Sequence, residues 1–366
     1  MAEHQFKPDR PAPKSEVGLI GWLRKNFFST WYNSLFTIVV LYLVIPALYH
    51  FAQWAFIDAS WIGNDRNACT VGGGACWVFI EDRFPQLIYG FFPESMRWRP
   101  DLVYLGAALL IGWLAWPKAP KKIWVGAFTI FIFPIIALIL LNGGLFGMEK
   151  VETSKWGGVL VTLVLALSGI VISLPFGTVL ALGRRSKMPI IRTLSTVYIE
   201  FWRAVPLITV LFMASVMLPL FTTSDVGIDK LLRAMIGITM FYSAYMAEVI
   251  RGGLQAIPKG QYEAAESLGL SYWKTMIFVI LPQALKITIP SIVNTFISLF
   301  KDTSLVLIIG IFDLLAIGQA ALSDPSWLGF SVEMYVFIAF VFWVFCFGIS
   351  RYSIYIEKKL HTGHKN

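Results

Sequence analysis

The chain has 366 residues, of which 57% are hydrophobic and 14% are charged, and its mean hydropathy is +0.68. Soluble proteins carry roughly 25% charged residues, so this composition excludes a disordered chain, a coiled coil and an ordinary soluble domain. The formal net charge is +8, but the basic residues lie between apolar runs, which is typical of membrane topology rather than of a nucleic-acid-binding face. A polytopic membrane protein is the class that remains.

The chain contains apolar runs that are long enough to be membrane-spanning helices. Such a helix needs about 20 mostly apolar residues. The first 26 residues are polar and a run of full span length follows them, so we expect no cleavable signal peptide. The sequence predicts an all-α fold with about eight spans. They lie at residues 32–54, 102–117, 123–142, 158–183, 205–221, 231–250, 276–300 and 332–351.

The distribution of Lys and Arg predicts the orientation of these spans. Most of the 30 basic residues fall before residue 32, at 118–122, at 184–192, at 251–274 and after residue 350. The positive-inside rule therefore places both termini in the cytoplasm. A further apolar stretch at 305–322 has Asp313 near its middle, where a charge is costly. We expect that stretch to be re-entrant or interfacial rather than a ninth span.

The outer loop at residues 55–101 contains two cysteines. Cys69 and Cys76 flank a glycine-rich segment, and an outer compartment is oxidising. The pair forms either a structural disulfide or two free thiols, and we favour the disulfide. Cys346 lies in the last span, where we expect it to pack against lipid or other helices.

The inner loop at residues 251–274 is the most informative stretch. Pro258 suits a helix start, and residues 259–268 are mostly good helix formers. Gly269 is placed to end that helix in the left-handed conformation. Leu270 would then fold back on the helix, as a Schellman ending requires. The loop therefore predicts a short helix exposed on the cytoplasmic side.

The surface of this short helix allows two interpretations. Ala264 and Ala265 permit close approach of another surface, while Glu263 and Glu266 can pair with basic groups on it. Ser271 can cap the helix that follows. A helix of about ten residues is marginal alone in water, so something must hold it. It either rests on the bundle of its own chain or docks to a partner protein.

The pattern resembles a known family. Glu263-Ala264-Ala265, Gly269 and Leu281-Pro282 resemble the Glu-Ala-Ala loop of permease subunits of bacterial binding-protein-dependent ABC importers, with Val279 as a mild departure. Segments 198–207, 247–253 and 297–305 resemble the polar amino-acid branch, the histidine/glutamine/arginine permeases. The resemblance covers residues 157–359. The additional N-terminal spans resemble those of the larger general L-amino-acid permeases of Gram-negative bacteria.

The predicted spans and the resemblance together imply an architecture of three segments. An N-terminal extension at 1–156 holds three spans and the outer loop. A type I importer core of five helices at 157–359 contains the coupling loop at 251–274, and a cytoplasmic tail follows at 360–366. In this family the coupling helix sits on a separate ATPase. The residues that it implies for this contact are Glu263, Ala264, Ala265, Leu268 and Gly269.

The resemblance also implies the partners and the division of chemistry. The partners are an ATP-binding subunit, a second permease that we expect to be a related sister chain, a periplasmic amino-acid-binding protein and the lipid of the bacterial inner membrane. We expect no catalytic residue, metal or cofactor on this chain, with ATP and Mg²⁺ bound by the ATPase. The chain contains no Walker-type phosphate loop, and its four histidines do not cluster as metal ligands would.

Three pairs of residues are candidates for the substrate path, each with an alternative role. Glu200 and Arg203 either bind a zwitterion or form an internal ion pair. Lys301 and Asp302 form either a gate, a contact for the binding protein or a solvated helix end. Asn294 and Ser298, predicted to face a helix interior, either line the path or hold helices together. The candidates are Glu200, Arg203, Asn294, Ser298, Lys301 and Asp302.

Three other classes of protein compete with an importer subunit. An ion-gradient-driven secondary amino-acid transporter commonly shows repeated halves and intramembrane acids, but here only Glu248 and Asp313 are plausible buried acids. A membrane enzyme needs clustered His, Asp or Glu at one membrane face. A channel leaves the coupling loop unexplained.

Overall fold

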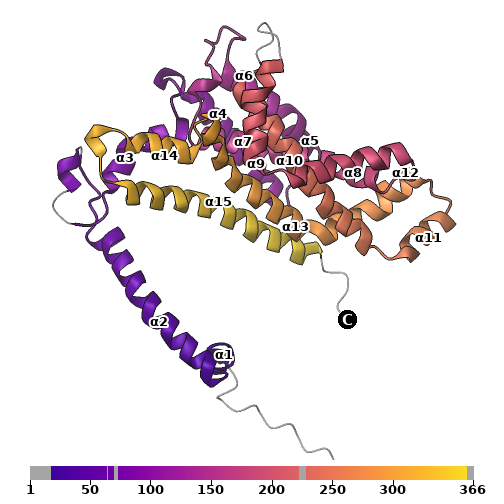
Figure 1. Cartoon of the computed structure of the whole chain (residues 1–366), viewed down its shortest axis with the longest axis horizontal. Helices are drawn as coiled ribbons and strands as arrows, with labels where there is room; N and C mark the ends of the chain where they lie inside the picture. The colour runs from indigo at the N-terminus through magenta and orange to yellow at the C-terminus, as the bar shows by residue number, and fades with distance from the viewer. Residues whose placement is uncertain (1–17, 64, 70–72, 222–227, 361–366) are drawn as a thin grey trace, which may run out of the picture. The chain divides into compact units, whose positions relative to one another are not determined.

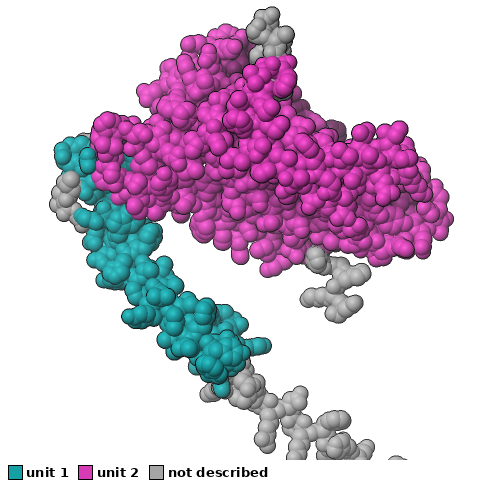
Figure 2. Space-filling model, viewed as in Figure 1, with its two compact units in different colours: residues 1–79 teal, residues 80–366 magenta. Residues whose placement is uncertain are grey.

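The computed structural model describes residues 18–63, 65–69, 73–221 and 228–360. Within these ranges the regular structure is helical, and the only β-type pairings are three isolated bridges (Figure 1). The chain divides into two compact units, residues 1–79 and 80–366 (Figure 2). The predicted cytoplasmic positions of both termini concern residues that lie largely outside the described ranges, at 1–17 and 361–366.

Unit 1 contains one long apolar helix. The helix α1 spans Gly18–Phe27, α2 spans Trp31–Ala52, and a π-helical turn at Gln53–Ile57 continues α2. The Thr30 side chain accepts a hydrogen bond from the Asn33 N–H and so caps the start of α2. None of the side chains of α2 is buried. A helix that is apolar on all sides and unburied has the surface expected of a span surrounded by lipid.

A small disulfide-bonded loop follows this helix. A 3₁₀ turn at Arg66–Cys69 leads into the segment that a disulfide between Cys69 and Cys76 closes. The Trp77 indole N–H donates to the Ala55 carbonyl over 2.7 Å, which ties the end of the loop back to its beginning. The loop thus has the pairing that the sequence predicts for an oxidising compartment.

Unit 2 is a bundle of helices, and α3 crosses the boundary between the units. Several of its helices are continued by short 3₁₀ or π segments. In chain order the elements are α3 (Trp77–Tyr89), η3 (Glu94–Met96), α4 (Trp98–Ala115), α5 (Lys122–Ala127), η4 (Phe128–Ile132), α6 (Phe133–Asn142), η5 (Thr153–Lys155), α7 (Val159–Arg184), α8 (Pro189–Ala204), α9 (Leu207–Phe212), η6 (Met213–Met217), η7 (Leu218–Phe221), α10 (Lys230–Ala256), α11 (Lys259–Ser267), α12 (Tyr272–Thr275), η8 (Met276–Ile280), α13 (Leu281–Asp302), η9 (Thr303–Ile309), α14 (Leu314–Leu322), η10 (Pro325–Trp327) and α15 (Ser331–Leu360).

The centre of unit 2 is the packing of α10 against α7 and α13 (Figure 1). Close approach of α7 and α10 requires a glycine, because a Cβ atom at Gly177 would lie 2.9 Å from the Ser243 carbonyl oxygen. Small residues at such contacts let helices pack tightly in membranes. Two clusters of buried side chains result. One contains Leu165, Ile238 and Leu299, and the other contains Met246, Ile250 and Ile280.

The stretch at 305–322 forms no continuous helix. Gly310, in the left-handed conformation at φ +69°, ends η9, and Asp313 then caps the nine-residue α14 by accepting from the Leu315 and Ala316 N–H groups. A helix of this length is roughly 14 Å long and cannot cross a hydrocarbon core of about 30 Å. Asp313 thus lies at a break rather than within a span, which agrees with the expectation that this stretch is not a ninth span.

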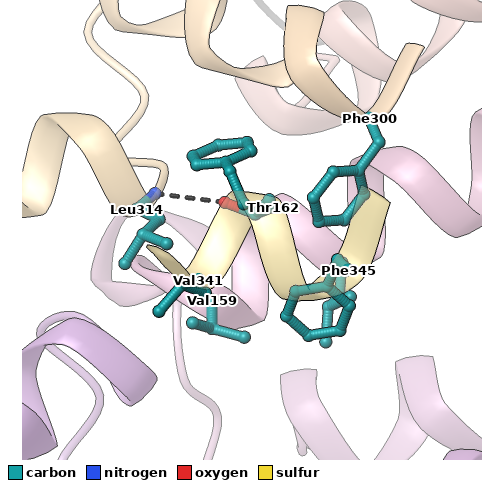
Figure 3. A pocket seen from close by; sticks show the side chains of 8 residues that line it. Val159, Thr162, Phe300, Leu314, Val341 and Phe345 are labelled. Carbon is teal, nitrogen blue, oxygen red and sulfur yellow. Dashed lines mark hydrogen bonds between the residues drawn. The ribbon is translucent and has the colours of Figure 1, made fainter. Parts of the chain in front are cut away.

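A buried threonine fixes the start of α14 to the start of α7. The Thr162 hydroxyl donates to the Gly158 carbonyl and accepts the Leu314 N–H, each over 3.1 Å. Figure 3 shows this hydrogen bond beside the rings of Phe300 and Phe345. The contact supplies an acceptor to an N–H group at a helix start, which has no partner inside its own helix.

The number of membrane spans is smaller by length and apolarity than the predicted eight. Among the described residues, five helical stretches are long and apolar enough: 31–57, 122–142, 159–184, 272–309 and 331–360. A sixth exists if α8 and the 207–221 segment, bent by 101°, count together. The helices α4 and α10, which contain two further predicted runs, do not qualify, and both helices carry charged residues, Arg99 and Asp101 in α4 and Arg233 and Glu248 among those in α10. The count of eight is therefore not confirmed.

Candidate functional site

The helix α11 forms where the sequence predicts it. Pro258 occupies the N-cap position with φ −59°, and the helix runs over Lys259–Ser267, one residue less than predicted. Proline restricts φ to this region and so prepares the chain for the first helical turn. Pro258 therefore determines where α11 begins.

The C-terminus of α11 is a Schellman motif. Gly269 has φ +72°, its N–H donates to the Glu266 carbonyl over 2.9 Å, and the Leu270 N–H donates to the Ala265 carbonyl over 3.1 Å. This is the pair of hydrogen bonds that the motif requires. The predicted cap is confirmed. Ser271 occupies the N-cap position of α12 with extended backbone, but its side chain makes no capping hydrogen bond.

The two alanines of the loop face in different directions. Ala265 is buried, with 3% of its surface exposed, whereas Ala264 and Glu263 are exposed. Leu268 is 80% exposed. One alanine thus packs against the chain itself. The other, with Glu263, Leu268 and the exposed Gly269, forms a free surface that a second protein can contact.

Two residues of α11 make side-chain hydrogen bonds to other elements in the part of the chain that the structure describes. Gln261 Oε1 accepts from Gln283 of α13 over 3.0 Å. The Tyr262 hydroxyl accepts from Arg185 at the end of α7 over 3.1 Å and donates to the Leu254 carbonyl of α10 over 3.4 Å. The short helix is therefore attached to three helices of the bundle.

Glu200 and Arg203 do not pair with each other. Glu200 accepts from Arg184 Nη2 over 2.8 Å, and the nearest carboxylate to Arg203 is Glu248, at 3.7 Å. Glu248 also binds Arg184 and Arg251, the latter over 2.8 Å. The cluster joins α7, α8 and α10 and contains one more arginine than carboxylates. The i,i+3 spacing on α8 thus did not predict the partners.

Two tyrosines of α10 connect two of the candidates. The Tyr242 hydroxyl donates to Asp302 over 2.5 Å. The rings of Tyr242 and Tyr245 lie 6.2 Å apart, and Arg203 lies over the Tyr245 ring with its Cζ 5.9 Å from the centroid. An anionic group and a cationic group therefore lie at the two ends of a tyrosine pair. Sequence reasoning missed both tyrosines, although their i,i+3 spacing places them on one helix face.

The remaining candidates are less connected. Asn294 and Lys301 are exposed on α13, and Ser298 is half-buried. The expectation that Asn294 faces a helix interior is wrong for the isolated chain. Its amide makes no hydrogen bond within the described ranges. It is thus available to a ligand or to another chain rather than used to hold this bundle together.

A cavity of ≈310 Å³ lies beside the bend between α8 and α9. The bend follows from Val205-Pro206, because proline lacks an N–H and keeps the preceding residue extended. Trp202, Met213 and Met240 make the cavity apolar. Among the described residues that line it, Arg233 is the one charged side chain, and its Nη1 donates to the Ser215 carbonyl over 2.7 Å. No carboxylate is found among the described residues that line this cavity.

The sequence matches a known family over most of the bundle. The model of the family described as "Binding-protein-dependent transport system inner membrane component" matches residues 173–362. The chain is 54% identical over 357 residues to the inner membrane amino-acid ABC transporter permease protein YhdY of Escherichia coli strain K12, and the match covers 97% of each chain.

A second curated relative and one solved structure are also similar. The chain is 37% identical to the glutamate/glutamine/aspartate/asparagine transport system permease protein BztC of Rhodobacter capsulatus, with 97% of each chain covered. A chain of the crystal structure of an amino acid ABC transporter with histidines is 32% identical. That match covers 55% of this chain and 92% of the other, with a TM-score of 0.49.

Proposed function

The chain belongs to the family of binding-protein-dependent transport system inner membrane components, and we propose that it is the permease subunit of an ATP-driven amino-acid importer. The substrate class comes from relatives that match along nearly the whole chain and are named as amino-acid permeases. Membership in this family favours the importer over the ion-gradient-driven alternative.

The observation that carries the proposal is the free surface of α11. A nine-residue helix is marginal in water, yet this one has a complete Schellman ending and exposes Glu263, Ala264 and Leu268. We propose that Glu263, Ala264, Ala265, Leu268 and Gly269 form the contact with the ATPase. Within it Ala264 permits close approach, Glu263 pairs with a basic group and Leu268 enters an apolar pocket. Ala265 lies on the opposite face of α11, where it packs the helix against its own bundle.

The proposed division of labour places ATP and Mg²⁺ on the partner. Closure of the ATPase subunits would displace α11 and rock the permease subunits between inward-facing and outward-facing states. The contact at α11 then needs to differ in free energy between these states, since only a differential interaction shifts an equilibrium. This chain supplies the path and the mechanical connection.

We propose a substrate path along the tyrosine pair of α10. A zwitterionic amino acid requires an acceptor for its ammonium group and a donor for its carboxylate. Asp302 supplies the first, and Arg203, whose 3.7 Å contact to Glu248 is long, supplies the second. Asn294, Ser298 and Lys301 extend the path along α13, while Glu200 acts indirectly through Arg184.

The proposed assembly contains two permease chains and a periplasmic binding protein. The N-terminal extension at 1–156 favours a sister chain as the second permease. In the proposed topology the loop at residues 55–101 of this extension lies on the periplasmic side of the membrane. With both termini cytoplasmic, a C-terminal reporter that is active only in the cytoplasm should give signal. An outward-facing C-terminus would contradict the topology.

The decisive experiment is purification of the tagged chain from native inner membranes, followed by identification of the co-eluting chains. An ATPase and a second permease are expected. Uptake of radiolabelled L-amino acids in proteoliposomes should require ATP inside and the binding protein outside. Uptake that persists without ATP and collapses with an uncoupler would instead support the secondary transporter.

A further inference from the structure

The end of α10 leaves a buried carbonyl without its ordinary partner. In a continuing helix the Leu254 carbonyl would accept the N–H of the residue four positions later, but that residue is Pro258, which has none. Leu254 is 1% exposed, and a buried carbonyl without a hydrogen bond is costly. Arg185 Nη1 donates to this oxygen over 2.8 Å. Arg185, at the end of α7, therefore supplies the hydrogen bond that the Leu254 carbonyl near the end of α10 lacks within its own helix.

The same guanidinium reaches α11. Arg185 Nη1 lies 3.1 Å from the Tyr262 hydroxyl, which in turn lies 3.4 Å from the Leu254 oxygen. The Arg185 Cζ lies 5.7 Å from the centroid of the Tyr262 ring, within the range of a cation–π contact. We refer to Arg185, Leu254 and Tyr262 as the Arg185 cluster. Its three members come from α7, α10 and α11.

The α7 side of this cluster is held independently. Arg185 is the C-cap residue of α7, and its N–H donates to the Leu182 carbonyl over 3.1 Å. The preceding residue, Arg184, is bonded to Glu200 of α8 and to Glu248 of α10. The backbone that carries the Arg185 side chain is thus fixed to two further helices, so the side chain is a short connection from α11 to a rigid end of the bundle.

The second polar attachment of α11, from Gln261 to Gln283, is a weaker type of hydrogen bond. The hydrogen bond between Gln261 and Gln283 joins two neutral amides. Hydrogen bonds that involve an ionised donor are roughly twice as strong as neutral ones. A guanidinium also offers several donors in a fixed plane, which a lysine ammonium does not. Arg185 is therefore the stronger of the two polar attachments.

We propose that Arg185 is a positioning residue that joins α11 to the ends of α7 and α10, so that a displacement of α11 moves these helices together. The inference rests on the proposed function, because it assumes that an ATPase displaces α11. It assigns Arg185 a role in transmitting that motion rather than in holding the ATPase.

A double-mutant cycle in the reconstituted complex tests this role. Arg185→Gln, Tyr262→Phe and the double variant are assembled with the ATPase, the second permease and the binding protein in proteoliposomes. Two quantities are measured, the ATP hydrolysed per radiolabelled L-amino acid imported and the amount of ATPase that co-purifies. Arg192→Gln is the matched control, because this exposed arginine on α8 is outside the cluster.

We expect each single variant to raise the ratio of ATP hydrolysed to amino acid imported by about fivefold, the scale set by one hydrogen bond. The double variant should not exceed Arg185→Gln, because that change already removes the contact to Tyr262 together with the bond to the Leu254 carbonyl. ATPase co-purification should stay at the wild-type level, and Arg192→Gln should match wild type. Hydrogen exchange at residues 259–270 in the assembled complex should rise in both single variants, and more in Arg185→Gln, which also removes the bond to Leu254.

Three results would overturn the inference. These are single variants with a wild-type ratio, a double variant whose effect is the product of the two, or ATPase lost from Arg185→Gln but not from Tyr262→Phe. The last would make Arg185 a direct ATPase contact. Failure of the proposed function is distinguishable, because the wild-type complex would then lack an ATPase or show no ATP-driven uptake.

Discussion

Gly269 is the residue whose replacement most directly tests the coupling role that we propose for α11. It adopts φ +72°, and a Cβ atom built there would have no heavy atom within 4 Å. A side chain at this position therefore meets no steric obstacle, and the cost of substitution is conformational. For L-residues the left-handed region costs roughly 1–2 kcal/mol, less for asparagine and more for β-branched residues.

These costs predict an order of effects. Gly269→Asn should be close to wild type, Gly269→Ala intermediate and Gly269→Val most severe. A penalty of about 2 kcal/mol lowers the ratio of capped to uncapped helix by roughly thirtyfold. Without the cap, the hydrogen bonds from Gly269 and Leu270 to the last turn are lost, and nine residues cannot hold a helix alone.

The assay compares amino-acid uptake with ATP hydrolysis in reconstituted complexes of the series. We expect uptake to fall in the order asparagine, alanine, valine, while hydrolysis falls less, because the ATPase keeps its own active site. Two outcomes would refute the reasoning: a valine variant that transports like wild type, or an asparagine variant as impaired as valine. Either outcome would show that the left-handed conformation of Gly269 is not what coupling depends on.

Three further changes have expected outcomes. Glu263→Lys reverses an exposed charge on α11 and should reduce the amount of ATPase that co-purifies by several fold. The control Glu81→Lys on α3 should leave that amount unchanged. An equal loss of ATPase in both variants would contradict a docking role for Glu263. Thr162→Val leaves the N–H that starts α14 buried without an acceptor. That change should cost about 1–3 kcal/mol, seen as a lower thermal unfolding midpoint in detergent, and an unchanged midpoint would contradict it. Gly177→Val places a Cβ within 3 Å of the α10 backbone and should cost about 1–3 kcal/mol or more. Gly112→Val, whose Cβ is unobstructed, should be nearly neutral, and similar unfolding midpoints for the two valine variants would argue against the close contact.

The sequence predicts those parts of the structure that local chemistry decides. Pro258 and Gly269 determine the two ends of α11 through their own backbone preferences, and Leu270 follows from the geometry of the cap. For residues 305–322 the sequence predicts from the charge of Asp313 that the stretch is no ninth span, but not the cap at Asp313 or the left-handed Gly310 that break it. In each case the deciding residues lie within a few positions of the structure that they determine.

Contacts between distant segments were not predictable in the same way. Glu200 and Arg203 have the spacing of an ion pair on one helix, yet each finds a partner on another helix. A single sequence gives no measure of whether Arg184 or Arg203 approaches Glu200 more closely, because that depends on how α7 and α8 pack. The connection from Asp302 to Arg203 through two tyrosines depends in the same way on the packing of α10.

The membrane count shows a different limit, which lies in the hydropathy criterion itself. The helix α10 is central in the bundle and buries residues along most of its length. A helix surrounded by protein can carry Glu248 and Arg251, because their charges are paired within the bundle. Apolarity therefore identifies helices that face lipid, such as α2, better than those that form the centre of a transporter.

Arg184 and Arg185 illustrate how one sequence feature has two physical roles. Their position at the end of a span contributes to the positive-inside signal, and lysines would satisfy that rule equally well. The observed contacts require several donors on one side chain. Arg184 contacts two carboxylates, and Arg185 contacts a carbonyl and a hydroxyl on different elements. A planar guanidinium suits such divided contacts better than a flexible ammonium does. Topology accounts for a charge at these positions, and their contacts with other helices account for the charged residue being arginine.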